Sequence, residues 1–458
     1  MNNSPSTSVV TRFAPSPTGM FHVGGIRSAL YNYLFARKHG GKFILRCEDT
    51  DPVRSKPEFE KYFLDVFDWL GLEFDEYYRQ SERTSIYRTY IESLISQDKA
   101  YISHEDPKEE GQRSEVIRFR NPNTIVTFED LVLGPISFDT KELGDFVIAR
   151  DIDSPLYHFT VVVDDHEMGI THIIRGQEHV SNTPRQILIQ DAIGAKRPYY
   201  AHASVILNEE RAKLSKRDPS VRPALEYKEE GYLPLALLNF MALLGWNPGT
   251  PQEVFTRDEL VSSFSIERMQ KPGAIFNSEK LEWFNREHLK LLDNETRFHF
   301  TKSFLGTRVL ELPQYSDERL ERALFSITDR LKHFGELRIM ADAHELDFYF
   351  VSPVISDSNV LLWKTQRTET DGLSRTRTYL SHVLSIFQSI QESDWTLDTV
   401  RTQVWPYAEE HGRGDVLWPT RFALAGVEKS PDPFTLAYIL GKTESEARIS
   451  LALTLLHE

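Results

Sequence analysis

The first 48 residues alternate between strand-like and helix-like segments, and this order constrains the fold more than any other feature of the chain. Residues 9–14 (VVTRFA) have the length and apolar character of a buried strand, and the proline- and glycine-containing stretch 15–19 breaks it into a loop. Residues 26–39 carry apolar side chains at helical spacing and are followed by two glycines. A second apolar strand is expected over 42–48. This order is typical of the βαβ unit of a parallel nucleotide-binding sheet.

The rest of the chain divides into a mixed first half and a helical second half. The expected segments of the first half are, in chain order, helices at 57–71 and 84–97, a polar loop or short excursion at 103–124, short strands between 125 and 152, buried strands at 157–165 and 170–176, and a helix from 182–184. The strands before residue 100 and after residue 157 are expected to share one sheet, split by an insertion. Helical patterns dominate beyond residue 225, at 233–245, 279–291, 317–334, 376–392, 398–410 and 444–456.

Composition excludes several classes of protein. Apolar residues make up 40% and charged residues 26% of the 458 residues, which is typical of a globular chain. The net charge of −15 argues against a protein held to DNA by overall positive charge, although local basic patches can still meet a nucleic acid. The single cysteine, Cys47, excludes an internal disulfide and a zinc site built on paired cysteines. The most apolar run, 233–246, is too short to span a membrane, so we expect a soluble, cytoplasmic protein.

Two polar motifs follow the first and the last strands of the expected sheet. His22-Val23-Gly24-Gly25 stands where a strand passes into a helix, and the free N–H groups of a helix N-terminus suit a polyphosphate. Lys213-Leu214-Ser215-Lys216-Arg217 puts three cations in five residues, which can close over phosphates. Each motif alone also fits an ordinary polar helix start or a solvated basic loop, and their pairing is more informative. P-loop and dinucleotide glycine patterns are excluded, because Leu436 and Leu417 replace required glycines.

Six segments together resemble glutamyl-tRNA synthetases, which are class I aminoacyl-tRNA synthetases. They are RFAPSPTG (12–19), HVGG (22–25), GGKFILRCEDTD (40–51), VVVDDHEMGITHIIRG (161–176), NTPRQ (182–186) and KLSKR (213–217), in the order of that family. The resemblance implies an α/β fold with a Rossmann-type parallel-sheet catalytic domain and an α+β insertion, followed by all-α C-terminal anticodon-binding domains. The implied divisions are the first half of the Rossmann domain at 1–100, a shortened acceptor-end insertion at 101–155, its second half with the KLSKR loop at 156–222, a stem-contact helical domain at 223–315, and an anticodon-binding helical domain at 316–458.

The resemblance also implies a reaction in two steps. Glutamate and ATP, with Mg²⁺, give glutamyl-adenylate and pyrophosphate, and the glutamyl group then passes to the 3′ terminal adenosine of tRNA(Glu). Adenylate formation is expected to require bound tRNA. Because the substrate carboxylate is already a nucleophile, the chemistry depends on orientation and charge stabilisation and needs no general base.

Roles for individual residues follow from the same resemblance. Arg12 and Arg175 would face the γ-carboxylate of glutamate, since guanidinium binds carboxylate with two parallel hydrogen bonds. Glu48 would receive the α-ammonium, and the alternative is that Arg12 and Glu48 simply pair with each other. The implied sites are catalytic His22, Lys213 and Lys216; glutamate-binding Arg12, Ala14, Ser16, Glu48, Tyr157, Val161 and Arg175; ATP-binding His22, Gly24, Gly25, Glu178, His179, Ile206, Lys213, Leu214, Ser215, Lys216 and Arg217; anticodon-reading Arg330; and no bound metal.

Some features leave alternatives open. The segment 100–118 is shorter than in relatives, and because it has no cysteine and His104 has no evident partner ligand, zinc is not expected. Arg330 would favour an enzyme that rejects the glutamine tRNA, but tRNA(Gln) stays open as a second substrate. Asp164 and Asp165, at the end of the strand expected over 157–165, are assigned a structural role.

Three other functions were weighed against this interpretation. A truncated paralogue that glutamylates a tRNA base would lack the long region after residue 290. A glutaminyl enzyme would not need two arginines for its amide substrate. A non-catalytic tRNA-binding relative would gain nothing from a pyrophosphate clamp. We expect a monomer that binds L-glutamate and tRNA, and neither a membrane nor DNA.

Overall fold

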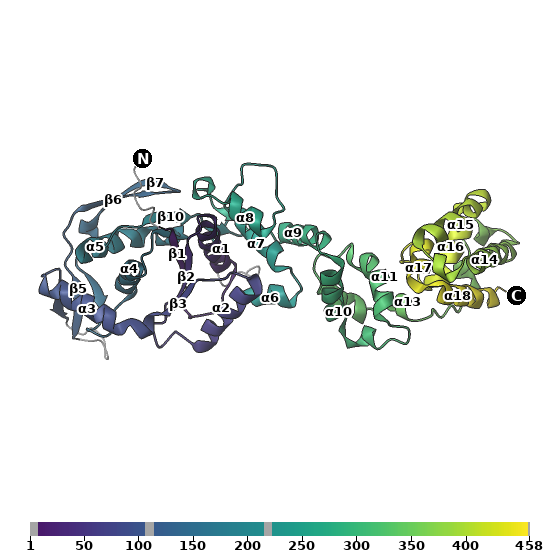
Figure 1. Cartoon of the computed structure of the whole chain (residues 1–458), viewed down its shortest axis with the longest axis horizontal. Helices are drawn as coiled ribbons and strands as arrows, with labels where there is room; N and C mark the ends of the chain where they lie inside the picture. The colour runs from purple at the N-terminus through teal and green to yellow at the C-terminus, as the bar shows by residue number, and fades with distance from the viewer. Residues whose placement is uncertain (1–7, 106–113, 215–221, 457–458) are drawn as a thin grey trace. The chain divides into compact units, whose positions relative to one another are not determined.

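The computed structural model describes residues 8–105, 114–214 and 222–456. The chain forms two compact units, residues 1–288 and 289–458. The first unit contains the strands and the helices around them, and the second unit is helical (Figure 1). No helix in the described residues is both long enough and apolar enough to cross a membrane.

The predicted βαβ unit is present at the start of the chain. Strand β1 (Val10–Phe13) leads to helix α1 (Val23–Lys38), which leads to strand β2 (Lys42–Cys47), and the two strands are parallel with Val10 opposite Lys42. Strand β3 (Glu76–Arg79) adds to the other side of β2, also in parallel. Alternate residues of β2 enter different apolar clusters, which places packed helices on both faces of this sheet.

A second sheet continues from the first across a narrow seam. Its strand order is β7-β6-β10-β9, and its strands are β6 (Ile125–Asp130), β7 (Gly134–Asp139), β9 (His172–Gly176) and β10 (Tyr199–Ala203). The Thr171 N–H donates to the carbonyl oxygen of Val10 at 2.9 Å, just before β9, and the Thr171 hydroxyl also bonds that residue. The single sheet expected from the sequence is therefore two short sheets that meet where β1 and β9 are adjacent.

Residues 157–165 form a helix, so the expected buried strand is wrong. Helix α4 (Tyr157–Glu167) buries every residue from Phe159 to Asp165. A segment that is buried on all sides shows neither helical nor strand periodicity, and the β-branched run of valines favoured the strand. Asp164 and Asp165 therefore lie on a buried helix, not at the end of a strand.

The first part of the predicted insertion, 101–155, differs from the expectation, whereas the short strands expected between 125 and 152 are present. The polar segment 103–124 is not simply a loop, because β4 (Ala100–His104) and β5 (Glu115–Phe119) pair in antiparallel register and β8 (Phe146–Ala149) pairs with β5. Within the described parts of 101–155 the regular elements are strands and one 3-10 turn, η2 (Thr140–Leu143).

The helices predicted at 57–71 and 84–97, from 182–184, and at 233–245 and 279–291 are present, and several short helices and strands between them were not predicted. The remaining elements of the first unit are α2 (Pro57–Leu70), η1 (Gln80–Arg83), α3 (Thr84–Ser96), η3 (Gln177–Asn182), α5 (Thr183–Ile193), β11 (Ile206–Leu207), α6 (Ala224–Glu229), α7 (Pro234–Leu243), α8 (Arg257–Ser263), η4 (Ile266–Arg268), β12 (Ala274–Ile275) and α9 (Ser278–Lys290). The apolar cluster that contains residues of α1 and α2 also contains residues of α7 and α8, so these two helices pack onto the core of the βαβ unit.

The second unit is built from helices joined by short turns. They are α10 (Asn294–Leu310), α11 (Asp317–Thr328), α12 (Glu336–Asp342), α13 (Asp347–Phe350), η5 (Ser358–Leu361), η6 (Gln366–Thr368), α14 (Gly372–Ser389), η7 (Glu392–Asp394), α15 (Leu397–His411), α16 (Arg413–Ala425), α17 (Pro433–Leu440) and α18 (Lys442–Thr454). The helix expected over 317–334 ends earlier, at Thr328.

Asp164 connects four segments of the first unit through buried hydrogen bonds. Its carboxylate accepts from the Gln80 amide at 2.8 Å, from Arg83 Nε at 2.7 Å and from the Tyr87 hydroxyl at 2.8 Å. Arg46 of β2, which is also fully buried, lies 3.7 Å away. The structural role assigned to this aspartate is thus visible as a link between α4, β2, η1 and α3.

Replacement of Asp164 should therefore be costly. Asp164→Ala would leave Arg83 without its acidic partner, remove one of the three carboxylates around Arg46, and leave Gln80 and Tyr87 without their buried acceptor. We therefore expect the free energy of unfolding to fall by about 3–5 kcal/mol. Asp153→Ala is the matched control, since Asp153 makes an exposed pair with Arg88 and its loss should cost less than about 1 kcal/mol. Urea denaturation of both variants measures the difference, and equal small losses would contradict the proposed link.

Candidate functional site

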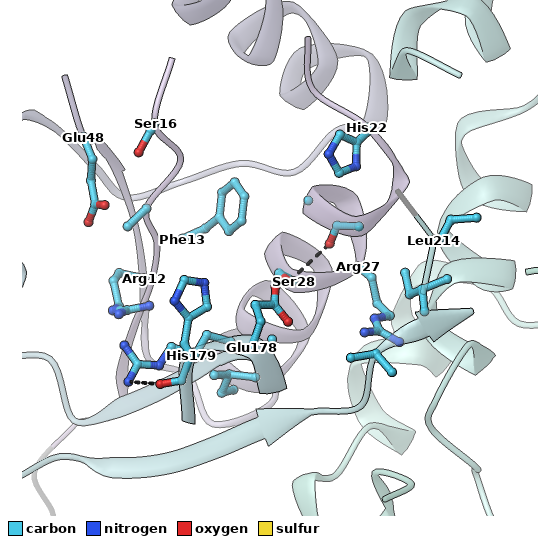
Figure 2. Close-up of a pocket in the computed structure, with 18 of the residues that line it drawn as sticks. Arg12, Phe13, Ser16, His22, Arg27, Ser28, Glu48, Glu178, His179 and Leu214 are labelled. Atoms are coloured by element: carbon cyan, nitrogen blue, oxygen red, sulfur yellow. Dashed lines mark hydrogen bonds between the residues drawn. The ribbon is translucent and has the colours of Figure 1, made fainter. Parts of the chain in front are cut away.

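A cavity of about 800 Å³ opens at the carboxyl ends of β1 and β9, beside the N-terminus of α1 (Figure 2). Open parallel sheets bind ligands at this edge. The structure brings fourteen of the sequence-predicted residues to this one cavity: Arg12, Ala14, Ser16, His22, Gly24, Gly25, Glu48, Tyr157, Arg175, Glu178, His179, Ile206, Lys213 and Leu214. Two stretches far apart in the sequence, before residue 50 and after residue 156, therefore share a single site.

Two of the other predicted residues, Val161 and Arg330, are not among the described residues that line this cavity. Val161 is buried one helical turn after Tyr157, and its place in the glutamate set stays a prediction. Ser215, Lys216 and Arg217 lie outside the described residues. Arg330 is an exposed residue in the turn after α11, in the second unit.

Buried charges occupy the end of the cavity near β1 and β2. The Arg12 guanidinium bonds Asp165 of α4, with Nε 3.2 Å from Oδ1, and Arg46 bonds the same oxygen at 2.8 Å. Glu48 accepts from Arg46 at 3.3 Å. Arg12 therefore pairs with Asp165, and Glu48 pairs with Arg46. The direct pairing of Arg12 with Glu48, which the sequence left open, is not observed between these described residues. Arg12 and Glu48 both line the cavity, and Figure 2 shows them across it from His22.

Glu48 has an unusual proton affinity. Burial raises the pKa of its carboxyl group to about 7, although Arg46 and Arg12 act in the opposite direction. Burial also raises the pKa of the neighbouring Tyr157 hydroxyl, so that group stays protonated at neutral pH. A cation that entered the cavity beside Glu48 would restore the charged carboxylate, which makes this position a receptor for an ammonium group.

Arg175 forms a second cationic wall from β9. Its Nη2 donates to the Thr183 hydroxyl at 2.9 Å and to the His179 carbonyl at 3.4 Å. Its Nη1 has no hydrogen-bond partner among the described residues, although Arg175 is buried and only 6% exposed. Burial lowers the pKa of this guanidinium, which shows that its charge is poorly solvated. An uncompensated buried cation of this kind suits a carboxylate ligand.

The N-terminus of α1 forms the opposite side of the cavity. His22 precedes the helix in extended conformation, and the helix begins with Val23, Gly24 and Gly25. A Cβ at Gly25 would lie 2.2 Å from the ring of Phe21, so no larger residue fits there without displacing that ring. Gly25 therefore allows Phe21 to pack against the first turn, and Gly24 and Gly25 both line the cavity. Exposed N–H groups at such a turn stabilise phosphate.

Sequence reasoning missed six residues that line the cavity: Phe13, Arg27, Ser28, Ile174, Gly176 and Val205. Arg27 is the notable one, because it is buried, donates to the Leu244 carbonyl at 3.0 Å and also bonds the Ser204 carbonyl. Its position one turn after the glycines of α1 was the only available signal. That signal did not distinguish it from an ordinary cation on a helix face.

Within the described residues, no group of three or more histidine, cysteine, aspartate or glutamate side chains could hold a metal ion.

Burial lowers the pKa of His179 to about 4, so its ring is neutral at physiological pH. The Tyr157 hydroxyl lies 3.5 Å from His179 Nδ1. The fixed cations that line the cavity are therefore arginines and Lys213.

The raised pKa of Glu48 generates a pH prediction. The unfolded value is about 4.3, so between that pH and about 7 the folded protein holds a proton that the unfolded chain releases. The stability of the wild type relative to Glu48→Gln should thus fall as pH rises through this window. Urea denaturation of both proteins from pH 5 to pH 8 checks this. A difference that is independent of pH would contradict the assignment.

Comparison with known proteins agrees with this geometry. Residues 8–114 and 103–283 match the family model described as tRNA synthetases class I (E and Q), catalytic domain. Residues 298–453 match the one described as Anticodon binding domain. A glutamate–tRNA ligase from Thermodesulfovibrio yellowstonii is 37% identical over 478 residues, which cover 96% of this chain and 98% of the relative. One from Aquifex aeolicus is 45% identical over 317 residues, 62% of this chain and 67% of the relative.

A solved structure is similar over almost the whole chain. The crystal structure of a glutamate tRNA ligase from Elizabethkingia meningosepticum, in complex with its amino acid, has a TM-score of 0.83 and 32% sequence identity. The match covers 98% of this chain and 100% of that one. The sequence-derived resemblance is confirmed, and the chain belongs to the class I tRNA synthetases of the glutamate and glutamine family.

Proposed function

We propose that this chain is a glutamate–tRNA ligase, which activates L-glutamate with ATP and transfers it to the 3′ end of tRNA(Glu). The observation that carries the proposal is the single cavity that joins two buried arginines and a buried carboxylate to a glycine-rich helix N-terminus. Relatives that bear this activity in their names align over nearly the whole chain. No observation on the described residues favours a truncated paralogue, a glutaminyl enzyme or a non-catalytic tRNA-binding relative.

One end of the cavity fits the side-chain carboxylate and the ammonium group of glutamate. Arg12 and Arg175 would bind the γ-carboxylate from two sides, and Glu48 would bind the α-ammonium in its charged form. The hydroxyls of Ser16 and Tyr157 supply neutral hydrogen bonds nearby. The arrangement gives the γ-carboxylate and the α-ammonium partners of opposite charge, and it leaves the α-carboxylate free to react.

The other end fits ATP. The N-terminus of α1, with His22 before it, would face the phosphates, and Lys213, which also lines the cavity, would neutralise them. Ile206 would contact the adenine ring, while Glu178 and the neutral His179 lie between the two ends. Mg²⁺ would arrive with ATP as part of the substrate. The roles of Ser215, Lys216 and Arg217 rest on the KLSKR motif.

The chemistry requires positioning more than proton transfer. An α-carboxylate oxygen of glutamate attacks the α-phosphorus of ATP, and the bond to pyrophosphate breaks as glutamyl-adenylate forms. A ribose hydroxyl at the tRNA 3′ end then attacks the activated carbonyl and releases AMP. Cations and helix N–H groups stabilise the charge that moves onto pyrophosphate in the first step.

The helical second unit would recognise the tRNA, since residues 298–453 match an anticodon-binding family. Within it, Arg330 is exposed and available to a base. We include in the proposal that the enzyme works as a cytoplasmic monomer and without zinc. Whether tRNA(Gln) is a second substrate is decided by the charging experiment below.

Lysines of the KLSKR motif should act on the chemical step. We expect Lys213→Ala and Lys216→Ala each to lower the rate of pyrophosphate exchange by about 10²–10³-fold, because the developing charge would lose a fixed cation. The KM for glutamate should change little. Lys196→Ala, an exposed lysine outside the cavity, is the control. An unchanged exchange rate in the Lys216 variant would refute its role.

The function itself is tested with purified protein and total tRNA. We expect exchange of pyrophosphate into ATP that depends on both L-glutamate and tRNA, and weak competition by glutamine and aspartate. Purified tRNA(Glu) and tRNA(Gln) are then charged side by side. Charging of neither tRNA with glutamate would overturn the proposal, and charging of both would show that tRNA choice is relaxed.

A further inference from the structure

A buried row of three side chains connects β6 to the wall of the cavity. Asp130 at the end of β6, His202 of β10 and Arg175 of β9 are almost fully excluded from solvent. Asp130 Oδ2 lies 2.6 Å from His202 Nδ1. The Nε of Arg175 lies 3.2 Å from His202 Nε2. Of the three residues, only Arg175 lines the cavity.

The chemistry of these contacts fixes where the protons lie. The backbone N–H groups of Val132 and Leu133 donate to Asp130 Oδ1 at 3.0 and 2.8 Å. Burial alone would raise the pKa of Asp130, but the bond from His202 and these amides hold it below its usual value. An ionised carboxylate only accepts, so the imidazole must carry its proton on Nδ1.

The other nitrogen of His202 then has a lone pair that faces Arg175. Burial lowers the pKa of His202, so the ring is neutral and Nε2 is an acceptor. Arg175 Nε is always a donor, and the bond between them is therefore well matched. With Nη2 bonded to Thr183 and the His179 carbonyl, two of the three guanidinium nitrogens are held by the protein.

We propose that Asp130 and His202 are positioning residues that hold the guanidinium of Arg175 in one orientation, and so set the preference for a substrate carboxylate over its amide. The inference rests on the proposed function, in which Arg175 binds the γ-carboxylate of glutamate. A clamped guanidinium presents donors only. A carboxylate accepts from it, whereas an amide can point its NH₂ donor at it and leave both groups unsatisfied.

Three variants separate this role from simple core packing. His202→Leu removes the acceptor at similar size, and His202→Gln can keep an acceptor near the position of Nε2. Asp130→Asn would keep its oxygen on the backbone amides and turn its NH₂ toward His202. The imidazole proton would then move to Nε2, and a donor would face the donor of Arg175.

The kinetic result expected is selective. Asp130→Asn and His202→Leu should raise the KM for glutamate about 10- to 100-fold and reduce the preference for glutamate over glutamine, with the KM for ATP nearly unchanged. His202→Gln should stay close to the wild type. Tyr200→Phe is the matched control, because it removes one buried hydrogen bond, to Gln190, from the same strand.

Two results would overturn the inference and favour a packing role. One is an equal rise of the KM for glutamate in His202→Leu and His202→Gln, and the other is a parallel rise of the KM values for glutamate and ATP. A second measurement needs no activity. With ¹⁵N-labelled histidine, NMR should show His202 protonated on Nδ1 in the wild type and on Nε2 in Asp130→Asn. Protonation of the wild-type ring on Nε2 would also overturn it.

The two proposals fail in different ways. A wild type that does not charge tRNA with glutamate refutes the function, whatever the NMR spectrum shows. A wild type that charges tRNA normally, with glutamate KM and selectivity unchanged in Asp130→Asn, refutes the positioning role alone.

Discussion

The first unit depends on a buried arrangement of charges between β2 and α4. Arg46 has no exposed surface, and it contacts Glu48 as well as both aspartates of α4. Buried ions are costly unless each has a partner of opposite charge, so ion pairing holds these residues in place. The same set positions Arg12 and Glu48 at the cavity. Residues that hold the fold together and residues that face the ligand thus belong to one electrostatic network.

This arrangement explains why the two carboxylates near the cavity differ. Asp165 accepts from two arginines, and their charges hold its pKa below the usual value in spite of its burial. Glu48 has one such bond, from Arg46, and burial dominates its titration. Asp165 is therefore a permanent anion that fixes arginines, whereas Glu48 is left with capacity for a further cation.

Much of the fold could be predicted from local sequence patterns. The βαβ unit, the helix after HVGG and the helices of the second half follow from apolar periodicity and from glycine and proline positions. The segment from residue 157 could not be assigned in this way, because burial on all sides removes the periodic signal that separates helix from strand. The ends of 103–124 were missed because their strands are polar on one face and depend on pairing with each other.

The cavity was predicted well by motifs and poorly by single residues. Three residues of HVGG and the first two residues of the KLSKR motif line the cavity, and the family resemblance supplied Arg12, Glu48 and Arg175. Arg27 and the contact between Asp130 and His202 had no comparable signal. The latter two residues are 72 positions apart, and only the fold brings them together.

The seam between the two sheets has a thermodynamic consequence. Arg12 belongs to β1 on one side, and Arg175 belongs to β9 on the other. Few backbone hydrogen bonds join β1 to β9. A dicarboxylate bound to both guanidiniums would therefore add an interaction that connects the two strands. Binding of the amino acid would then stabilise the contact between the two sheets. Saturation with substrate would therefore raise the free energy of unfolding of this part of the enzyme.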